Sequence, residues 1–294
     1  MKSKFFIIFI ILFFLINNKL FFSQEQNNIK FEFLPLGVHF LPLKANYEEA
    51  RVGILYYPSD GKLKVDIGND IDLFAFYFPK INSTLTLSIE FMAYALSRNY
   101  EQNRLQIDAL DGFFGGNVSF SKSYSDGKLL SRFRIIHNSA HLVDGHYDLK
   151  LHNWIDDSKP IPFAKDFGEL LLGYQFLPDF GSARIYSAIS YSTLIRPLIL
   201  KKWTGFIGFE AATNKLTGKV FDHETNLFFA SHVSLEGNPT YTLNYNNLLG
   251  IKFGKWSEKG IIFYLSYYSG SHPFSEYYYK HVNQFGIGFF VDFF

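Results

Sequence analysis

Residues 84–93 read Thr-Leu-Thr-Leu-Ser-Ile-Glu-Phe-Met-Ala, a stretch in which polar and apolar side chains alternate. Successive side chains of a β-strand point to opposite faces of a sheet, so this alternation predicts one polar face and one apolar face. The apolar face would carry Leu85, Leu87, Ile89, Phe91 and Ala93, and the polar face Thr84, Thr86, Ser88 and Glu90. About ten residues are also what a tilted strand needs to cross a bilayer. The stretch therefore predicts a strand long enough to span a membrane.

The same alternation recurs along the chain, and turn-forming residues separate the alternating stretches. Ser59-Asp60-Gly61-Lys62 and Ser125-Asp126-Gly127-Lys128 are two of these turns. The pattern predicts twelve strands, at 50–57, 63–78, 84–97, 105–122, 129–141, 167–178, 183–195, 203–213, 227–236, 241–254, 259–269 and 284–293. Closed outer-membrane barrels favour an even number of strands. We therefore predict an all-β fold, a transmembrane antiparallel up-and-down β-barrel.

The composition agrees with such strands and argues against several other classes of protein. Hydrophobic residues make up 48% of the 294 residues, yet the mean hydropathy is only +0.01, because polar residues dilute the apolar ones. A helical membrane protein would need several apolar runs of about 20 residues, and this chain has a single candidate, at its start. The lack of cysteine removes disulfides, thiolate metal sites and a lipoprotein anchor. A net charge of +1 without a basic block gives nucleic-acid binding no support.

The N-terminus has the pattern of a secretory signal peptide. Lys2 and Lys4 precede an unbroken apolar run at residues 5–16, and the polar residues 17–19 follow it. The run is too short to cross a bilayer, which takes about 20 residues. An uncleaved anchor helix is the alternative interpretation. We expect a signal peptide at 1–23, an N-terminal extended or periplasmic segment at 24–49 and an outer-membrane barrel at 50–294.

Charged residues recur on the polar faces of the predicted strands, whereas the apolar faces are rich in aromatic residues. The strands of a soluble β-sandwich also alternate between polar and apolar residues. In a membrane barrel, lipid on the outside explains the apolar face and water in the lumen explains the charged face. The residues predicted to line the lumen are Asp70, Asp72, Glu90, Asp111, Arg132, Arg134 and Lys252. These charges either set the ion selectivity of a pore or pair with one another and plug the lumen. Twelve strands enclose a narrow interior, which favours the plugged form.

The lengths of the connections test the predicted orientation. If both termini lie in the periplasm, the long connections should lie on the extracellular side. The two longest, 142–166 and 270–283, do so, whereas 214–226 falls on the periplasmic side and is too long for the rule. We therefore expect that a strand beside 214–226 begins or ends inside this range.

Three segments of the chain carry specific patterns. The first is the run from His137 to Asp144, with the pattern H-x-S-x-H-L-x-D, and the second is the Tyr-rich run at 267–279. The third is the closing strand, where Phe293 ends the alternation and Phe294 follows it. Together they resemble a bacterial family classified as a domain of unknown function, whose members look like outer-membrane barrels. The family's second pattern has Ser next to Pro, and here His272 separates them. The resemblance, over about 35–294, implies a barrel in the outer membrane and implies no activity.

The terminal aromatic residues Phe293 and Phe294 also resemble the signal that the barrel-assembly machinery reads. We therefore expect that machinery and outer-membrane lipid as partners.

A shorter resemblance concerns chemistry. His137-x-Ser139 is similar to the H-x-S of outer-membrane lipid A 3-O-deacylases, in which a histidine can act as general base for a serine hydroxyl. Asp144, or Asp148, would then orient the histidine ring. The alternative is that His137, Ser139, His141 and Asp144 form a hydrogen-bonded cap that anchors the long connection at 142–166. We favour a structural or plugged barrel over a lipid ester hydrolase, and we expect no cofactor and no metal.

Overall fold

The computed structural model describes residues 29–100, 104–155, 159–220 and 222–293. The expected signal peptide at 1–23 and the terminal Phe294 lie outside these ranges. Twelve long strands build the fold: β2 (Val52–Tyr57), β3 (Lys62–Phe78), β4 (Ser83–Tyr100), β5 (Arg104–Ser123), β6 (Gly127–Leu142), β9 (Phe163–Phe176), β10 (Ser182–Arg196), β11 (Trp203–Thr213), β13 (His223–Gly237), β14 (Tyr241–Phe253), β15 (Gly260–Ser271) and β16 (His281–Asp292). Each of them overlaps one of the twelve predicted stretches.

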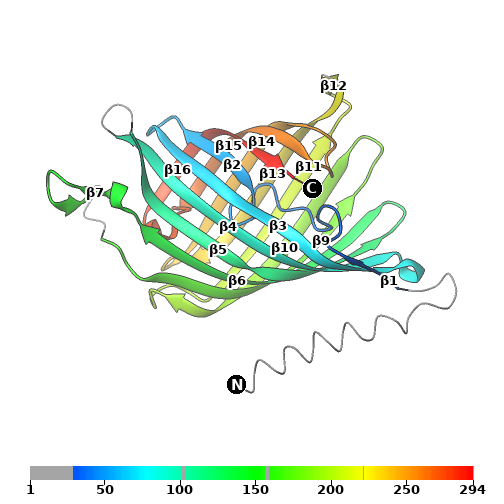
Figure 1. Cartoon of the computed structure of the whole chain (residues 1–294), viewed down its shortest axis with the longest axis horizontal. Coiled ribbons are helices and arrows are strands. Elements are labelled where there is room, and N and C mark those ends of the chain that lie inside the picture. Colours follow the sequence, from blue (N-terminus) through cyan, green and yellow to red (C-terminus); the bar gives the residue numbers. More distant parts are fainter. Residues whose placement is uncertain (1–28, 101–103, 156–158, 221, 294) are drawn as a thin grey trace, which may run out of the picture.

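These strands form one closed sheet. Each long strand pairs antiparallel with the next long strand in the chain, and β6 pairs directly with β9 and β11 with β13. The ring closes where β16 pairs with β2, from Ile287 opposite Tyr56 to Val291 opposite Val52. The predicted all-β barrel of twelve antiparallel strands is confirmed (Figure 1).

The remaining elements are short. They are the strands β1 (Lys30–Phe33), β7 (Tyr147–Asp148), β8 (Asn153–Trp154) and β12 (Lys219–Val220), and the 3-10 turns η2 (Pro79–Ile81), η3 (Asp144–His146) and η5 (Ser275–Tyr277). Within the described ranges no helix is long and apolar enough to cross a membrane.

Burial follows the alternation of the sequence along each long strand. On β6, Arg132 and Arg134 are each 1% exposed, whereas their neighbours Phe133 and Ile135 are 45% and 64% exposed. The polar face of the strand therefore points into the barrel and the apolar face points outward. This is the reverse of a soluble domain, which buries its apolar side chains and solvates its polar ones.

The long connections lie at one end of the barrel. Residues 143–155, which contain β7 and β8, and residues 272–280, which contain η5, lie there, and β12 lies at the opposite end (Figure 1). The connection before β13 is shorter than the sequence indicated, because β13 begins at His223 rather than at 227. β12 pairs with the start of β13, so part of this connection is a small hairpin. This hairpin accounts for the length of the connection at 214–226, which is too long for an irregular periplasmic turn.

The first strand of the wall is split into two pieces. β1 pairs with Phe74–Tyr77 of β3, and β2 pairs with Lys62–Asp66 of the same strand. The chain between β1 and β2 leaves the wall, and residues 39–51, which we call the inner segment, run through the barrel interior. Leu43 and Ala45 of this segment are fully buried. Residues 24–49 are predicted to be an extended or periplasmic segment, and the last part of that range, 39–49, lies among the lumen side chains.

Candidate functional site

The barrel interior is the candidate site, because charged residues of the wall meet the inner segment there. The seven charged residues that alternation assigns to the lumen lie on β3, β4, β5, β6 and β14. All seven are buried on inward faces: Asp70, Asp72, Glu90, Asp111, Arg132, Arg134 and Lys252. Buried charges must be paired or hydrogen-bonded to be tolerated, so the partners of these residues define the site.

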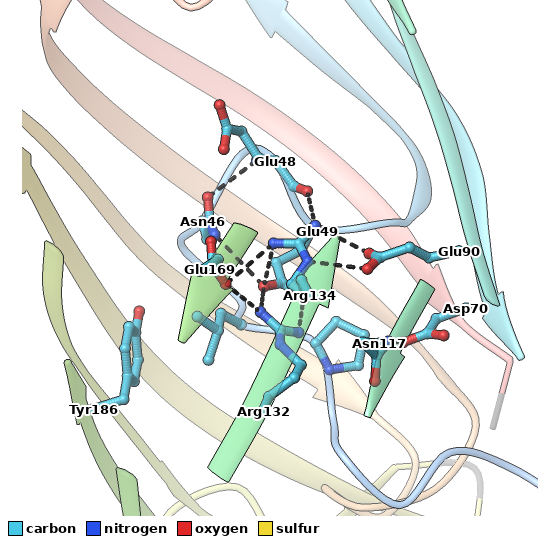
Figure 2. A network of polar contacts seen from close by, with 12 residues as sticks. Asn46, Glu48, Glu49, Asp70, Glu90, Asn117, Arg132, Arg134, Glu169 and Tyr186 are labelled. Atoms are coloured by element: carbon cyan, nitrogen blue, oxygen red, sulfur yellow. Dashed lines mark hydrogen bonds and ion pairs between the residues drawn. The ribbon is translucent and has the colours of Figure 1, made fainter. Parts of the chain in front are cut away.

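Arg132 and Arg134 form the centre of an ion-pair network. Arg132 donates to both carboxylate oxygens of Glu49 on the inner segment, over 2.9 and 2.5 Å. Arg134 donates from Nε and Nη2 to the two oxygens of Glu90 on β4, each over 3.0 Å. Glu169 of β9 lies 3.3 Å from Arg132 and 3.5 Å from Arg134. Two guanidinium groups and three carboxylates thus bind the inner segment to β4, β6 and β9 (Figure 2).

A second ion cluster joins the inner segment to the end of the closing strand. The Lys44 ammonium group lies 2.8 Å from Asp292 Oδ2, and the Lys252 ammonium group lies 2.6 Å from the same oxygen. All three side chains are buried. Asp292 therefore stabilises two buried cations and holds Lys44 against β14 and β16.

Asp72 and Asp70 of β3 lie side by side on the inward face but have different partners. The His39 backbone N–H donates to Asp72 Oδ2 over 2.9 Å, and His39 Nδ1 lies 2.7 Å from the same oxygen. Asp70 Oδ2 accepts a long hydrogen bond of 3.4 Å from Asn117. The other oxygen, Asp70 Oδ1, is buried and has no hydrogen-bond partner among the described residues. The inner segment thus satisfies Asp72 and leaves Asp70 incompletely paired.

The backbone of the inner segment is held by side chains of the wall. Arg184 donates to the carbonyl oxygens of Leu41 and Pro42, and one of its amino groups also lies 2.6 Å from Glu210 Oε2. The Asn246 amide donates to the carbonyl oxygen of Ala45 over 2.6 Å. A segment without regular structure leaves its backbone groups without ladder partners. Here the wall supplies those partners, and Phe40 and Leu43 of the segment also pack against apolar side chains of the wall.

Sequence reasoning missed the inner segment as part of the site. Glu49 and Lys44 provide the partners of Arg132 and Asp292, but they lie in a stretch without alternation. The available signal was the charge in that stretch, with Lys44, Glu48, Glu49 and Arg51 placed directly before a predicted barrel. A charge cluster there needs a polar surrounding, which the lumen provides.

Asp111 holds the second long connection in the mouth of the barrel. Its two carboxylate oxygens accept hydrogen bonds from the Ser275 backbone N–H, over 3.3 and 3.1 Å. The next residue, Glu276, accepts a hydrogen bond from the backbone N–H of Ile161 in the other long connection. Burial raises the pKa of Glu276 to about 7. Both long connections are therefore folded over this end of the lumen.

The cavities beside these elements are small. One of about 30 Å³ lies next to Tyr47 and Glu48, and one of about 160 Å³ lies at the mouth between Arg98, Asp108 and Lys280. A single water needs roughly 10–15 Å³ of such volume. Cavities of this size have room for one to several water molecules.

Two of the three residues predicted for hydrolysis lie on the outer surface of the barrel, not in its lumen. His137 and Ser139 share the outward face of β6 and are half-buried. His137 Nδ1 lies 2.5 Å from Asp166 Oδ1 on the neighbouring strand β9. No hydrogen bond joins His137 to Ser139 in the described part of the chain. The side chain of the predicted third member, Asp144, lies outside what the structure describes.

Asp166 is the carboxylate that sequence reasoning missed. It lies 29 residues after His137, and only the pairing of β6 with β9 places it directly opposite that histidine. Among the described residues, no group of three or more His, Asp or Glu side chains is arranged to hold a metal ion. Comparisons of the chain with protein-family models, curated proteins and solved structures found no match.

Proposed function

We propose that this chain is an outer-membrane β-barrel whose lumen is closed by its own inner segment. The observation that carries the proposal is the outer surface of the barrel. Large apolar side chains are exposed on it from strand to strand, such as Ile67 at 60%, Leu172 at 56% and Ile207 at 61%. Soluble monomers rarely expose contiguous apolar patches of more than a few hundred Å². Lipid is the surrounding that makes such a surface stable.

The arrangement of the ends supports an orientation in the membrane. The two long connections lie at one end, as extracellular loops do in outer-membrane barrels. The N-terminal end of β2 and the C-terminal end of β16 lie at the other end, which we assign to the periplasm. The predicted signal peptide and the aromatic closing strand fit export and recognition by the barrel-assembly machinery.

The contacts of the inner segment support a closed lumen. The segment contacts β3, β6, β10, β14 and β16 through hydrogen bonds and ion pairs. It therefore reaches most of the way around the interior. A barrel filled in this way serves the envelope as a structural protein or as a closed pore.

Fractionation and gel mobility test the location. We expect the mature chain in the outer-membrane fraction, with faster migration in unboiled than in boiled samples, because a closed barrel resists detergent until it is heated. Recovery from the soluble periplasm, or a helical far-UV spectrum of the purified protein, would contradict the proposal.

Conductance tests the closure separately. We expect purified wild-type protein in a planar bilayer to give no steady current, since the lumen holds the inner segment rather than water. Large, stable current steps from the wild type would show an open pore instead.

A second candidate function is lipid ester hydrolysis at the outer surface. The observation that favours it is the Asp166 carboxylate on His137 Nδ1, which leaves the other ring nitrogen available as a general base. Ser139 lies two residues along the same face, and the Phe114 ring lies 4.9 Å from the His137 ring. Such a base would accept the proton of the Ser139 hydroxyl as its oxygen attacks an ester carbonyl. The two side chains would have to move into contact, as catalytic groups in unliganded sites often do.

Lipid analysis separates this candidate from a purely structural pair. If the protein is a hydrolase, cells that make it should contain lipid A or phospholipids with fewer acyl chains. Ser139→Ala should abolish those products at unchanged levels of the barrel. Ser131→Ala is the matched control, because Ser131 lies on the same face of the same strand, eight residues away. Identical lipids with and without the protein would remove the candidate.

A further inference from the structure

The wall of the barrel pairs its own buried cations without help from the inner segment. Each of the five buried basic residues on the described strands has an acidic partner on a strand: Lys64 with Asp66, Arg132 with Glu169, Arg134 with Glu90, Arg184 with Glu210 and Lys252 with Asp292. Removing the inner segment therefore leaves no buried cation of the wall without a counter-charge. The barrel without the segment therefore still meets the requirement that a buried cation has a partner of opposite charge.

The wall also carries a surplus of acid. Nine acidic residues and five basic residues are buried on the described long strands. Of the four acids left after the pairing above, Asp108 pairs with Arg98 of β4. The other three, Asp70, Asp72 and Asp111, have no basic partner on the described strands. Asp72 is satisfied by His39 of the inner segment, and Asp111 by a backbone N–H of the mouth connection. The surplus carboxylates lie on β3 and β5, the two strands that flank β4, and Asp70 lies opposite Glu90 of β4.

The polar contacts that hold the inner segment are of a kind that water can replace. They are ion pairs and hydrogen bonds to its side chains and carbonyl groups. Its apolar contacts are made mainly by Phe40 and Leu43, which pack in one buried cluster, and by Tyr47, which packs against a second. Residues 39–51 contain no strand and no helix. If the segment moves out, water can enter a lumen that is lined by polar groups.

We propose that the inner segment is a displaceable plug and that the lumen it leaves conducts cations. This inference rests on the proposed closed outer-membrane barrel. Solvated carboxylates are ionised at neutral pH, so Asp70, Asp72 and Asp111 give the open lumen a net negative charge. Charged side chains that line a pore set its ion selectivity. A lumen that accommodates a peptide segment is wide enough for a hydrated monovalent cation.

The test reverses the charge that anchors the plug. In Glu49→Lys, an ammonium group faces the Arg132 and Arg134 guanidinium groups, and the repulsion should expel the segment. We expect single-channel openings from Glu49→Lys in a planar bilayer between unequal KCl solutions, with a reversal potential close to that of K⁺. Glu258→Gln is the control for loss of a carboxylate, because Glu258 is an exposed residue outside the lumen, and it should stay as closed as the wild type.

A chemical label reports the position of the plug independently of current. The chain contains no cysteine, so Ala45→Cys, at a fully buried position of the segment, introduces a unique thiol. We expect a water-soluble thiol reagent to label Cys at position 45 at least tenfold faster in the Glu49→Lys background than in the wild-type background. Heat-modifiable mobility of both proteins confirms that the barrel is folded.

The outcomes separate this inference from the function on which it rests. Steady current from the wild type would contradict the closed barrel itself. A folded Glu49→Lys barrel whose position 45 stays unreactive, or becomes reactive without current, would overturn the displaceable plug or the pore. Anion-selective openings would overturn the charge argument. Adding Asp70→Asn and Asp72→Asn to Glu49→Lys should move the reversal potential toward zero, and an unchanged potential would also overturn it.

Discussion

Deletion of residues 289–294 is expected to abolish assembly of the barrel. β16 closes the ring, and its residues Phe289, Phe290 and Val291 pair with β15 on one side and β2 on the other. Without them β2 keeps two of its five pairs with the closing strand, at Tyr56 and Leu55. Each backbone group left unpaired in lipid costs several kcal/mol. The deletion also removes Asp292, which leaves the buried Lys44 and Lys252 without their carboxylate.

Immunoblots of membrane and periplasmic fractions measure this effect. We expect the truncated chain to be degraded or to remain in the periplasm, with less than a tenth of the wild-type level in the membrane. A chain that lacks only residues 293 and 294 is the matched control, because it keeps every described pair of β16. Equal loss in the control would assign the defect to recognition of the terminal aromatic residues, and normal levels of the longer deletion would show that the ring closes elsewhere.

Arg134→Leu is expected to cause the largest loss of stability among single substitutions in the lumen. The change removes the cation that binds Glu90 through two hydrogen bonds and also faces Glu169. Removing one partner of a buried ion pair costs about 3–5 kcal/mol, because the remaining charge stays buried without compensation. The double substitution Arg134→Leu and Glu90→Leu should recover a large part of this loss, since it removes both charges together.

Denaturant unfolding in lipid vesicles measures the free energies. Arg196→Leu is the control, because Arg196 is an exposed arginine at the end of β10 and its loss should change stability by less than about 0.5 kcal/mol. A cost for Arg134→Leu no larger than that of Arg196→Leu would show that the lumen is hydrated well enough to solvate Glu90 without its partner. A double variant that is less stable than the single one would contradict the pairing.

The sequence was sufficient to locate all twelve strands because the two sides of the wall meet opposite surroundings. Leu87 and Ile89 face outward while Ser88 and Glu90 face inward, and this contrast leaves a strong alternation in the sequence. The predicted strand boundaries differ from the structure where a strand continues past its alternating residues, as at the start of β13, which begins at His223 instead of 227. The inward direction of Arg132 and Lys252 follows from the same alternation.

The partners of those residues could not be derived in the same way. Alternation gives the face of a side chain but not the register between strands, so it cannot place Asp166 beside His137 or Asp292 beside Lys252. The inner segment has no periodicity, since its surroundings are irregular and mix buried charges with apolar side chains such as Leu130 and Leu171. Glu49 therefore reaches Arg132 across 83 residues of sequence without any local sign of the contact.

The split first strand limits how far the inner segment can travel. β1 and β2 both pair with β3, so the chain on either side of the inner segment is fixed to the wall. It can leave the lumen only as a loop, and it stays within reach of the opening that it vacates. Such a tether keeps the local concentration of the segment near the lumen in the millimolar range. Reclosure is then a fast unimolecular step, independent of protein concentration, and open periods would be brief unless a ligand outside the barrel retained the loop.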